Sequence, residues 1–195
     1  MALRQDVKVA ATSAVCEEAA LQGTISIGRQ CVVHPKCEIR ALAAPIVIGD
    51  RNILEDRVVL ESSPQAPDSS SPVMVVGADN LFESGSVVRA SYVGNGNWFE
   101  PKAYAQEGSV IGNNCLIGSG VVIEKHERVA DNSVIVCVQD ERGDLKRIVR
   151  QQKDYLLKAR EGLVQKYIDT FLDAKSIFAL EKNHRLVPVL PASNP

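Results

Sequence analysis

The sequence has few of the residues that most enzymes and membrane proteins depend on. It holds only 3 histidines and 5 % aromatic residues, and no run of 18 or more apolar residues. The absence of such a run excludes a membrane-spanning helix of the usual length. The net charge is only −2 at a pI near 6.0, which argues against a nucleic-acid surface or a polybasic membrane patch. The first residues lack the basic and apolar regions of a secretory signal, so we expect a cytoplasmic protein.

Cysteine spacing excludes another set of functions. No two of the 5 cysteines have CxxC spacing, so neither a zinc motif nor a thioredoxin-like motif is supported. An odd number of cysteines in a chain expected in the cytosol does not indicate a disulfide framework. We therefore predict that the thiols are small buried residues. The five are Cys16, Cys31, Cys37, Cys115 and Cys137.

An aliphatic residue recurs every six positions through most of the chain. The register runs from Val9 to Ile39, resumes at Ile48 and again at Val76, and after a one-residue deletion continues from Val93 to Ile135. A six-residue period drifts around a helix of 3.6 residues per turn, so a helix does not explain the pattern. Short strands joined by corners do explain it, with each six-residue unit forming one side of a triangular coil. We predict a parallel β-helix of about six coils over residues 7–150.

A longer phrase repeats at about three times this period. Copies that begin with Ile-Gly or Val-Gly and have Asn or Cys at the fifth position start at Ile27, Ile48, Val76, Val93 and Ile111. The last two spacings are about one eighteen-residue coil, and the longer first two contain insertions. Glycines therefore stack at one corner, where we expect backbone angles that other residues avoid. The stacked set is Gly28, Gly49, Gly77, Gly94 and Gly112.

The fifth position of the phrase is asparagine in three successive copies. Because coils lie about 4.8 Å apart, Asn52, Asn80 and Asn97 can form a hydrogen-bonded amide ladder. The alternative is that each side chain bonds only to its own backbone, as in an ordinary turn. The sequence does not separate these two interpretations.

Two segments interrupt or follow the repeat. Residues 61–73 are rich in proline and serine, and we predict an extruded loop, either a tolerated surface insertion or a site of partner contact or phosphorylation. Residues 151–185 change to a helical period, with Leu163, Tyr167 and Phe171 on one stripe. The stripe indicates either packing against a face of the β-helix or a partner-binding helix. We expect a flexible tail at 186–195.

Catalytic and metal sites have little support. Hexapeptide acyltransferases use a general-base histidine, and gamma-class carbonic anhydrases bind zinc through three histidines between subunits. Here His34 reads as a corner residue, His126 as a solvent-exposed residue and His184 as a helix C-terminal residue. We therefore predict no catalytic residue, no metal, no cofactor and no small-molecule substrate. A carbonic anhydrase-like or acyltransferase homotrimer remains the alternative.

Acidic and aromatic residues supply the candidates for a protein interface. Glu55, Glu83 and Glu100 follow the inward residue of three phrases and are either solvated corner residues or an acidic stripe awaiting a basic partner. Trp98 is the strongest candidate anchor, because tryptophan is enriched at interfaces, although it can equally pack beneath the C-terminal helix. The candidate interface residues are Trp98, Tyr92, Tyr104, Glu83 and Glu100.

Particular phrases resemble the dynactin subunit 6 family. They are the segment 32–55, VMVVGADNLFESG at 73–85 and NGNWFEPKAYA at 95–105, and the likeness covers roughly residues 7–150. The resemblance implies a left-handed coil and a non-catalytic subunit that pairs with dynactin subunit 5 in the pointed-end complex. It also implies contact with other pointed-end dynactin subunits and a role in engaging adaptors and cargo for dynein in microtubule-based transport.

Overall fold

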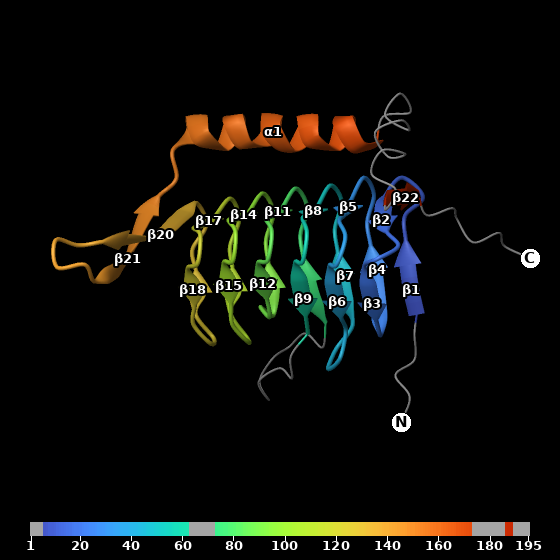
Figure 1. Ribbon diagram of the computed structural model, residues 1–195, viewed down its shortest axis with the longest axis horizontal. Coiled ribbons are helices and arrows are strands. Elements are labelled where there is room, and N and C mark those ends of the chain that lie inside the picture. The colour runs from blue at the N-terminus through green and yellow to red at the C-terminus, as the bar shows by residue number, and fades with distance from the viewer. Residues whose placement is uncertain (1–5, 63–72, 173–185, 189–195) are drawn as a thin grey trace, which may run out of the picture.

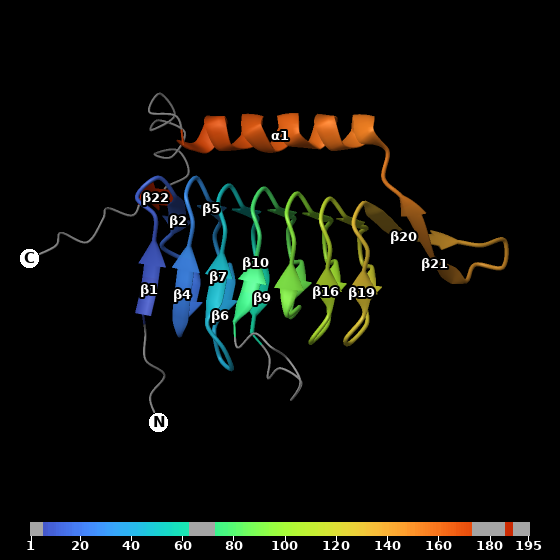
Figure 2. The same cartoon turned by 180° about the vertical axis from the view of Figure 1, so that it is seen from behind.

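The computed structural model describes residues 6–62, 73–172 and 186–188. Short strands wind into a triangular prism, and one long helix lies along it (Figures 1 and 2). Every strand of the coil pairs in parallel with the corresponding strand of the next coil. This parallel β-helix confirms the fold that the six-residue period predicts, and its left hand is the one that the resemblance implies.

Three sheets form the three faces of the prism. Sheet A contains seven strands and sheet C six, and sheet B contains seven coil strands with one antiparallel strand added at each end. The stack therefore has about seven turns rather than the six predicted, because the chain begins a further coil with β19 and β20 after the last complete one. Sheet A comprises β1 (Asp6–Val9), β4 (Thr24–Ile27), β7 (Ile46–Ile48), β10 (Met74–Val76), β13 (Tyr92–Val93), β16 (Val110–Ile111) and β19 (Arg128–Val129).

The other two sheets follow in the same order around each coil. Sheet B comprises β2 (Ala14–Cys16), β5 (Val32–Val33), β8 (Ile53–Leu54), β11 (Leu81–Phe82), β14 (Trp98–Phe99), β17 (Leu116–Ile117) and β20 (Ser133–Gln139), with β21 (Leu145–Gln151) and β22 (Leu186–Pro188) at its edges. Sheet C comprises β3 (Ala20–Gln22), β6 (Glu38–Arg40), β9 (Val59–Glu61), β12 (Val87–Val88), β15 (Tyr104–Ala105) and β18 (Val122–Ile123).

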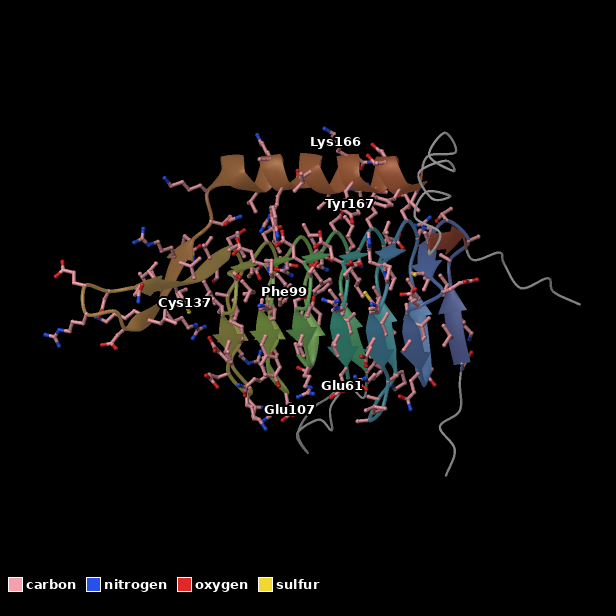
Figure 3. The ribbon with its side chains drawn as sticks, in the orientation of Figure 1. Glu61, Phe99, Glu107, Cys137, Lys166 and Tyr167 are labelled. Atoms are coloured by element: carbon pink, nitrogen blue, oxygen red, sulfur yellow. The ribbon has the colours of Figure 1, made fainter. Side chains whose placement is uncertain are left out.

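The repeated aliphatic residues fill the centre of the prism. Among the described residues they form one continuous buried cluster from Val15 to Ile135. Phe82 and Phe99 stack inside it with ring centroids 4.9 Å apart (Figure 3 labels Phe99). Such an aromatic pair contributes about 0.5–1.5 kcal/mol beyond the burial of its surface. The apolar period thus accounts for the continuous buried core of the described coils.

The glycine column lines up, but not for the expected reason. None of its five members has a positive φ; that conformation occurs two residues later, at Gln30, Arg51, Asp79, Gly96 and Asn114. What the column requires is space, because a Cβ placed on Gly94 would lie 2.6 Å from the carbonyl oxygen of Gly112. The prediction that these glycines supply unusual backbone angles is wrong, and close approach between coils replaces it.

The asparagines form a polar column inside the corner. Asn52 Oδ1 accepts hydrogen bonds from Asn80 N at 3.1 Å and from Asn80 Nδ2 at 3.0 Å. Asn80 Oδ1 accepts from Asn97 N at 2.8 Å, and Asn97 Oδ1 accepts from Cys115 N at 2.7 Å. Asn52 also donates to its own coil at Gly49 O, so the turn and ladder interpretations both describe real bonds. Ser13 extends the column, because its hydroxyl accepts from Cys31 N at 2.9 Å.

Helix α1 (Asp154–Leu172) lies along the outer face of sheet B and runs the length of the stack (Figure 1). Val164 and Ile168 are buried against Ile53 and Leu81 of that sheet. The predicted start at residue 151 is wrong, because Gln151 ends β21, and residues 173–185 of the predicted helix lie outside the described residues. The prediction of a flexible tail is wrong for its first three residues, since β22 pairs antiparallel with β2 and covers the edge of sheet B.

Burial decides the state of most thiols. Burial raises the pKa of Cys31 to about 11 and that of Cys37 to about 12. These thiols stay protonated at neutral pH and serve as small apolar residues. Cys137 is exposed on β20, beyond the last coil, so the prediction that all five thiols are buried is wrong for this one (Figure 3).

Candidate interaction surfaces

The candidate aromatic residues lie on three different faces. Tyr92, Trp98 and Tyr104 belong to consecutive strands of one coil, β13, β14 and β15, and each side chain points outward from its own sheet. Tyr92 is 41 % exposed on sheet A, whereas Trp98 and Tyr104 are half-buried. The structure therefore does not bring the five predicted residues together in one surface. The six-residue period places neighbouring candidates about one face apart.

Trp98 lies beneath helix α1. Its ring packs against the buried cluster formed by Ile53, Leu81, Val164 and Ile168. Its indole Nε1 donates a hydrogen bond to Glu83 Oε1 at 2.8 Å. This is the second of the two placements that the sequence allowed, and it commits most of the ring to the protein's own helix.

The glutamates at the corner between sheets B and C are bound within the chain. Glu55 accepts from Ser84 N at 3.1 Å, and Glu100 accepts from Ser119 N at 2.8 Å. Burial raises the pKa of Glu83, the nearby Glu55 and Glu100 charges act in the same direction, and the bond from Trp98 opposes them. The expected mutual repulsion is present at Glu83, but burial is the larger cause.

His34 is enclosed by the C-terminal helix. Its Nε2 lies 2.6 Å from the hydroxyl of Tyr167, and the rings of Tyr167 and Phe171 pack against it edge-on. Burial lowers the pKa of His34, while the carboxylates of Asp56 and Glu55 act in the opposite direction. The sequence interpretation of His34 as a plain corner residue missed this contact. Only the i, i+4 stripe of the helix, which includes Tyr167, offered a signal.

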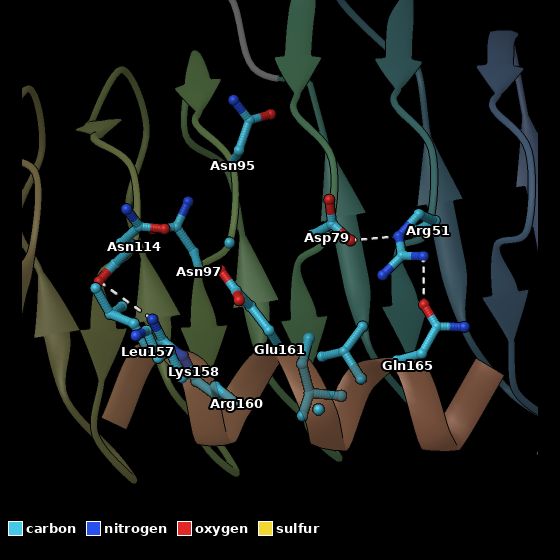
Figure 4. A pocket seen from close by; sticks show the side chains of 14 residues that line it. Arg51, Asp79, Asn95, Asn97, Asn114, Leu157, Lys158, Arg160, Glu161 and Gln165 are labelled. Atoms are coloured by element: carbon cyan, nitrogen blue, oxygen red, sulfur yellow. Dashed lines mark hydrogen bonds and ion pairs between the residues drawn. The ribbon is translucent and has the colours of Figure 1, made fainter. Parts of the chain in front are cut away.

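Polar side chains hold the middle of α1 at the corner between sheets A and B. Arg51 pairs with Asp79 at 2.5 Å and donates to Gln165 Oε1 at 2.6 Å, as Figure 4 shows. The buried Arg160 donates to the carbonyl oxygens of Cys115 and Asn114. Burial lowers the pKa of Arg160. Two basic residues thus fasten the helix to two separate coils, those of β7–β8 and β16–β17.

These residues border a cavity of about 580 Å³ between α1 and the corner that joins sheets A and B (Figure 4). Its lining carries amide, carboxylate and basic side chains, but no histidine, cysteine or serine. Elsewhere in the described part of the chain, no group of three His, Cys, Asp or Glu side chains has an arrangement that could hold a metal ion. The cavity therefore supplies polar and charged groups, but no histidine that could act as the general base of an acyltransferase.

Sheets A and C keep outward columns of apolar side chains that no described element covers. In sheet A, Val47, Val75, Tyr92 and Val110 are in register on successive strands. The sheet C column consists of Val59, Val87, Tyr104 and Val122, also in register. The sequence analysis singled out only the tyrosines of these columns. The valines follow from the same six-residue period, one position before each inward residue.

A charged ladder runs beside the sheet C column. Glu61 lies 2.8 Å from both Arg40 and Arg89, and Arg89 donates to the hydroxyl of Tyr104 at 2.9 Å. Figure 3 labels Glu61 at this edge of the stack. Tyr104 is therefore held by the Arg89 guanidinium. The hydroxyl of Tyr92 on sheet A has no hydrogen-bond partner among the described residues.

Comparison with known proteins identifies the family. A protein from Danio rerio named dynactin subunit 6 is 33 % identical over 80 % of this chain and 84 % of its own length. Another of that name from Nematostella vectensis is 36 % identical over 66 % of this chain and 73 % of its own length. The chain belongs to the dynactin subunit 6 family. Dynactin subunit 6 relatives from an amoeba and a nematode match at about the same identity.

More distant likenesses concern the repeat and the fold. Residues 90–125 match the family described as bacterial transferase hexapeptide (six repeats). A hexapeptide transferase family protein from Anaplasma phagocytophilum superposes with a TM-score of 0.68 at 14 % identity, covering 83 % of this chain and 89 % of that one. A carbonic anhydrase from Methanosarcina thermophila is 26 % identical over 64 % of this chain and 49 % of its own length. The superposition on the Anaplasma phagocytophilum protein shows that this chain shares its fold.

In the part of the chain that the structure describes, no helix is both long and apolar enough to cross a membrane.

Proposed function

We propose that this chain is a non-catalytic structural subunit of the dynactin pointed-end complex. It pairs with dynactin subunit 5, contacts other pointed-end subunits and helps dynein–dynactin engage adaptors and cargo in microtubule-based transport. Its place is the cytoplasm, on the cytoskeleton. The observation that carries the proposal is the run of dynactin subunit 6 relatives, which match at 30–36 % identity over most of the chain.

The physical form of the molecule supports a docking role. A solenoid whose coils are joined by parallel ladders and an internal polar column holds its faces in fixed positions. Two of these faces carry apolar columns in register, and the third is covered by the chain's own helix. A rigid block of this kind can bind a partner without losing backbone entropy on its own side.

The histidine placement also supports a non-catalytic subunit. A general-base histidine must reach the acceptor hydroxyl or amine of the substrate. His34 instead contacts Tyr167 and Phe171 of the same chain, and its side chain is only 15 % exposed. His126 is exposed at a different corner near the other end of the stack. The two described histidines thus lie on different coils and at different corners of the prism.

Mixing the purified chain with purified dynactin subunit 5 tests the proposal. We expect one complex containing both proteins in gel filtration, and no CO2 hydration above the uncatalysed rate. The rival, for which the carbonic anhydrase likeness is the specific observation, predicts a homotrimer with zinc bound in proportion to chain. A zinc-bearing homotrimer that hydrates CO2 and ignores subunit 5 contradicts the proposal.

A further inference from the structure

The β20–β21 hairpin extends past the last coil of the solenoid (Figures 1 and 2). Each of its strands has 7 residues, whereas the coil strand β17 beside it has 2. Val134 and Ile135 of β20 pair with β17, but from Val136 onward β20 pairs only with β21. A two-stranded hairpin on its own is marginally stable in water, so the projecting part depends on further contacts.

The projecting hairpin carries the most exposed large apolar side chain of the described residues. Leu145 is 74 % exposed and Val149 is 56 % exposed. Neighbouring exposed apolar side chains mark an interaction site, whereas apolar residues scattered singly over a surface are normal.

Strand register shows which way these side chains face. Val149 lies opposite Ile135, which is buried in the core, and Leu145 lies opposite Gln139 on the same side of the hairpin. Because side chains alternate along a strand, Leu145 and Val149 point to the side of the solenoid axis. They therefore overhang the end of the stack. Strands β18 and β19, the last strands of sheets C and A, form unpaired edges at this same end.

We call this end the C-terminal ledge, meaning Leu145, Val149 and the edges of β18 and β19. An unpaired edge presents backbone groups ready to bond another strand. A docked helix would leave both edges unpaired, and one extended segment would pair only one of them. The end coil of another solenoid has strands on the corresponding faces, so it can pair in parallel with both β18 and β19. Its apolar residues can then cover Leu145 and Val149.

A second copy of this chain fits the ledge poorly. Its N-terminal end carries β22 on the outer edge of β2, in the same sheet from which the hairpin extends at the C-terminal end. Head-to-tail stacking of two copies would bring β22 against the hairpin. A partner solenoid without a strand at that edge avoids this collision.

We infer that the C-terminal ledge is the docking site for the end coil of a second, non-identical β-solenoid. The inference rests on the proposed pairing with dynactin subunit 5, which the resemblance to the family implies is another β-helix. The partner pairs with the edges of β18 and β19 and covers Leu145 and Val149 with its own apolar residues.

The test compares two double variants for binding to purified dynactin subunit 5. The ledge variant is Leu145→Glu with Val149→Glu, and the control is Val47→Glu with Tyr92→Glu on the outer face of sheet A. Val47 and Tyr92 are each 41 % exposed, and the two ledge residues are more exposed still, so none of the four is part of the buried core. We expect the ledge variant to bind at least about tenfold more weakly, equivalent to 1.4 kcal/mol, and the control to bind as the wild type does. Amide hydrogen exchange of residues 136–149 should slow in the wild-type complex.

Each other result overturns the inference. If subunit 5 binds the ledge variant as tightly as the wild type, the site is elsewhere and the proposed function stands. If subunit 5 does not bind the wild type at all, the pairing itself is wrong and the ledge proposal falls with it. Equal loss in both variants removes the specificity of the ledge. A wild-type homodimer that the ledge variant abolishes in sedimentation makes a second copy the occupant. Unchanged circular dichroism and melting temperature establish that each variant is folded.

Discussion

Replacing Gly94 with alanine should destabilise the solenoid by loss of space, not by backbone strain. The added Cβ would lie 2.6 Å from Gly112 O and 2.6 Å from Asn113 Oδ1. Asn113 can move aside only by giving up its bond to Asn95 N, which is 2.8 Å long. The Gly112 carbonyl is backbone, so the two coils must separate locally.

The magnitude follows from these two effects. Overpacking a tight site costs about 1–3 kcal/mol, and a lost hydrogen bond adds about 0.5–1.5 kcal/mol. We expect Gly94→Ala to lower the free energy of unfolding by about 3 kcal/mol in urea titrations followed by circular dichroism. Gly162→Ala is the matched control, because nothing lies within 4 Å of its added Cβ. In the middle of α1 that change should stabilise by about 0.5–1 kcal/mol. A Gly94→Ala effect below about 0.5 kcal/mol would refute the close-approach argument.

Three further changes test the corner and the helix contacts. Glu83→Gln keeps an acceptor for Trp98 Nε1 and removes a carboxylate whose pKa is raised in the folded protein, so it should increase the free energy of unfolding at pH 7. This gain should vanish below the ordinary glutamate pKa, because wild-type Glu83 is then protonated in both the folded and the unfolded protein. A loss of stability at pH 7 contradicts this. Tyr167→Phe should lower the free energy of unfolding by about 1–2 kcal/mol in thermal or urea unfolding, because it removes the partner of Nε2 on the largely buried His34 side chain. An unchanged free energy of unfolding contradicts this. Titration of the native protein with a thiol reagent should show one rapidly reacting cysteine, and Cys137→Ser should abolish that reaction. Two or more rapidly reacting thiols would contradict the burial of the other four cysteines.

The six-residue period was enough to predict the fold because it acts locally. Each inward residue, such as Phe82 or Phe99, has the same place in its unit, so counting along the chain gives the face. The asparagine positions follow from the same count. The corner glycines were predicted to align, but their physical role required the distance between coils, which no single coil reveals.

The contacts of the C-terminal segment lay beyond the sequence. Which of three faces α1 covers depends on how the chain leaves the last coil, and that is set by the β20–β21 hairpin. Trp98 is covered because α1 lies on sheet B. If α1 lay on sheet A or sheet C, it would cover Tyr92 or Tyr104 in place of Trp98. The pairing of β22 with β2 likewise joins residues far apart in sequence, and no local sequence pattern predicts it.

Purification of the natively expressed, tagged chain from its own cells tests the central claim most directly. The account predicts that mass spectrometry finds dynactin subunits, subunit 5 among them, in amounts comparable to the tagged chain and resistant to moderate salt. Recovery of the chain alone, as a trimer of its own 21.1 kDa subunits carrying zinc, would contradict it.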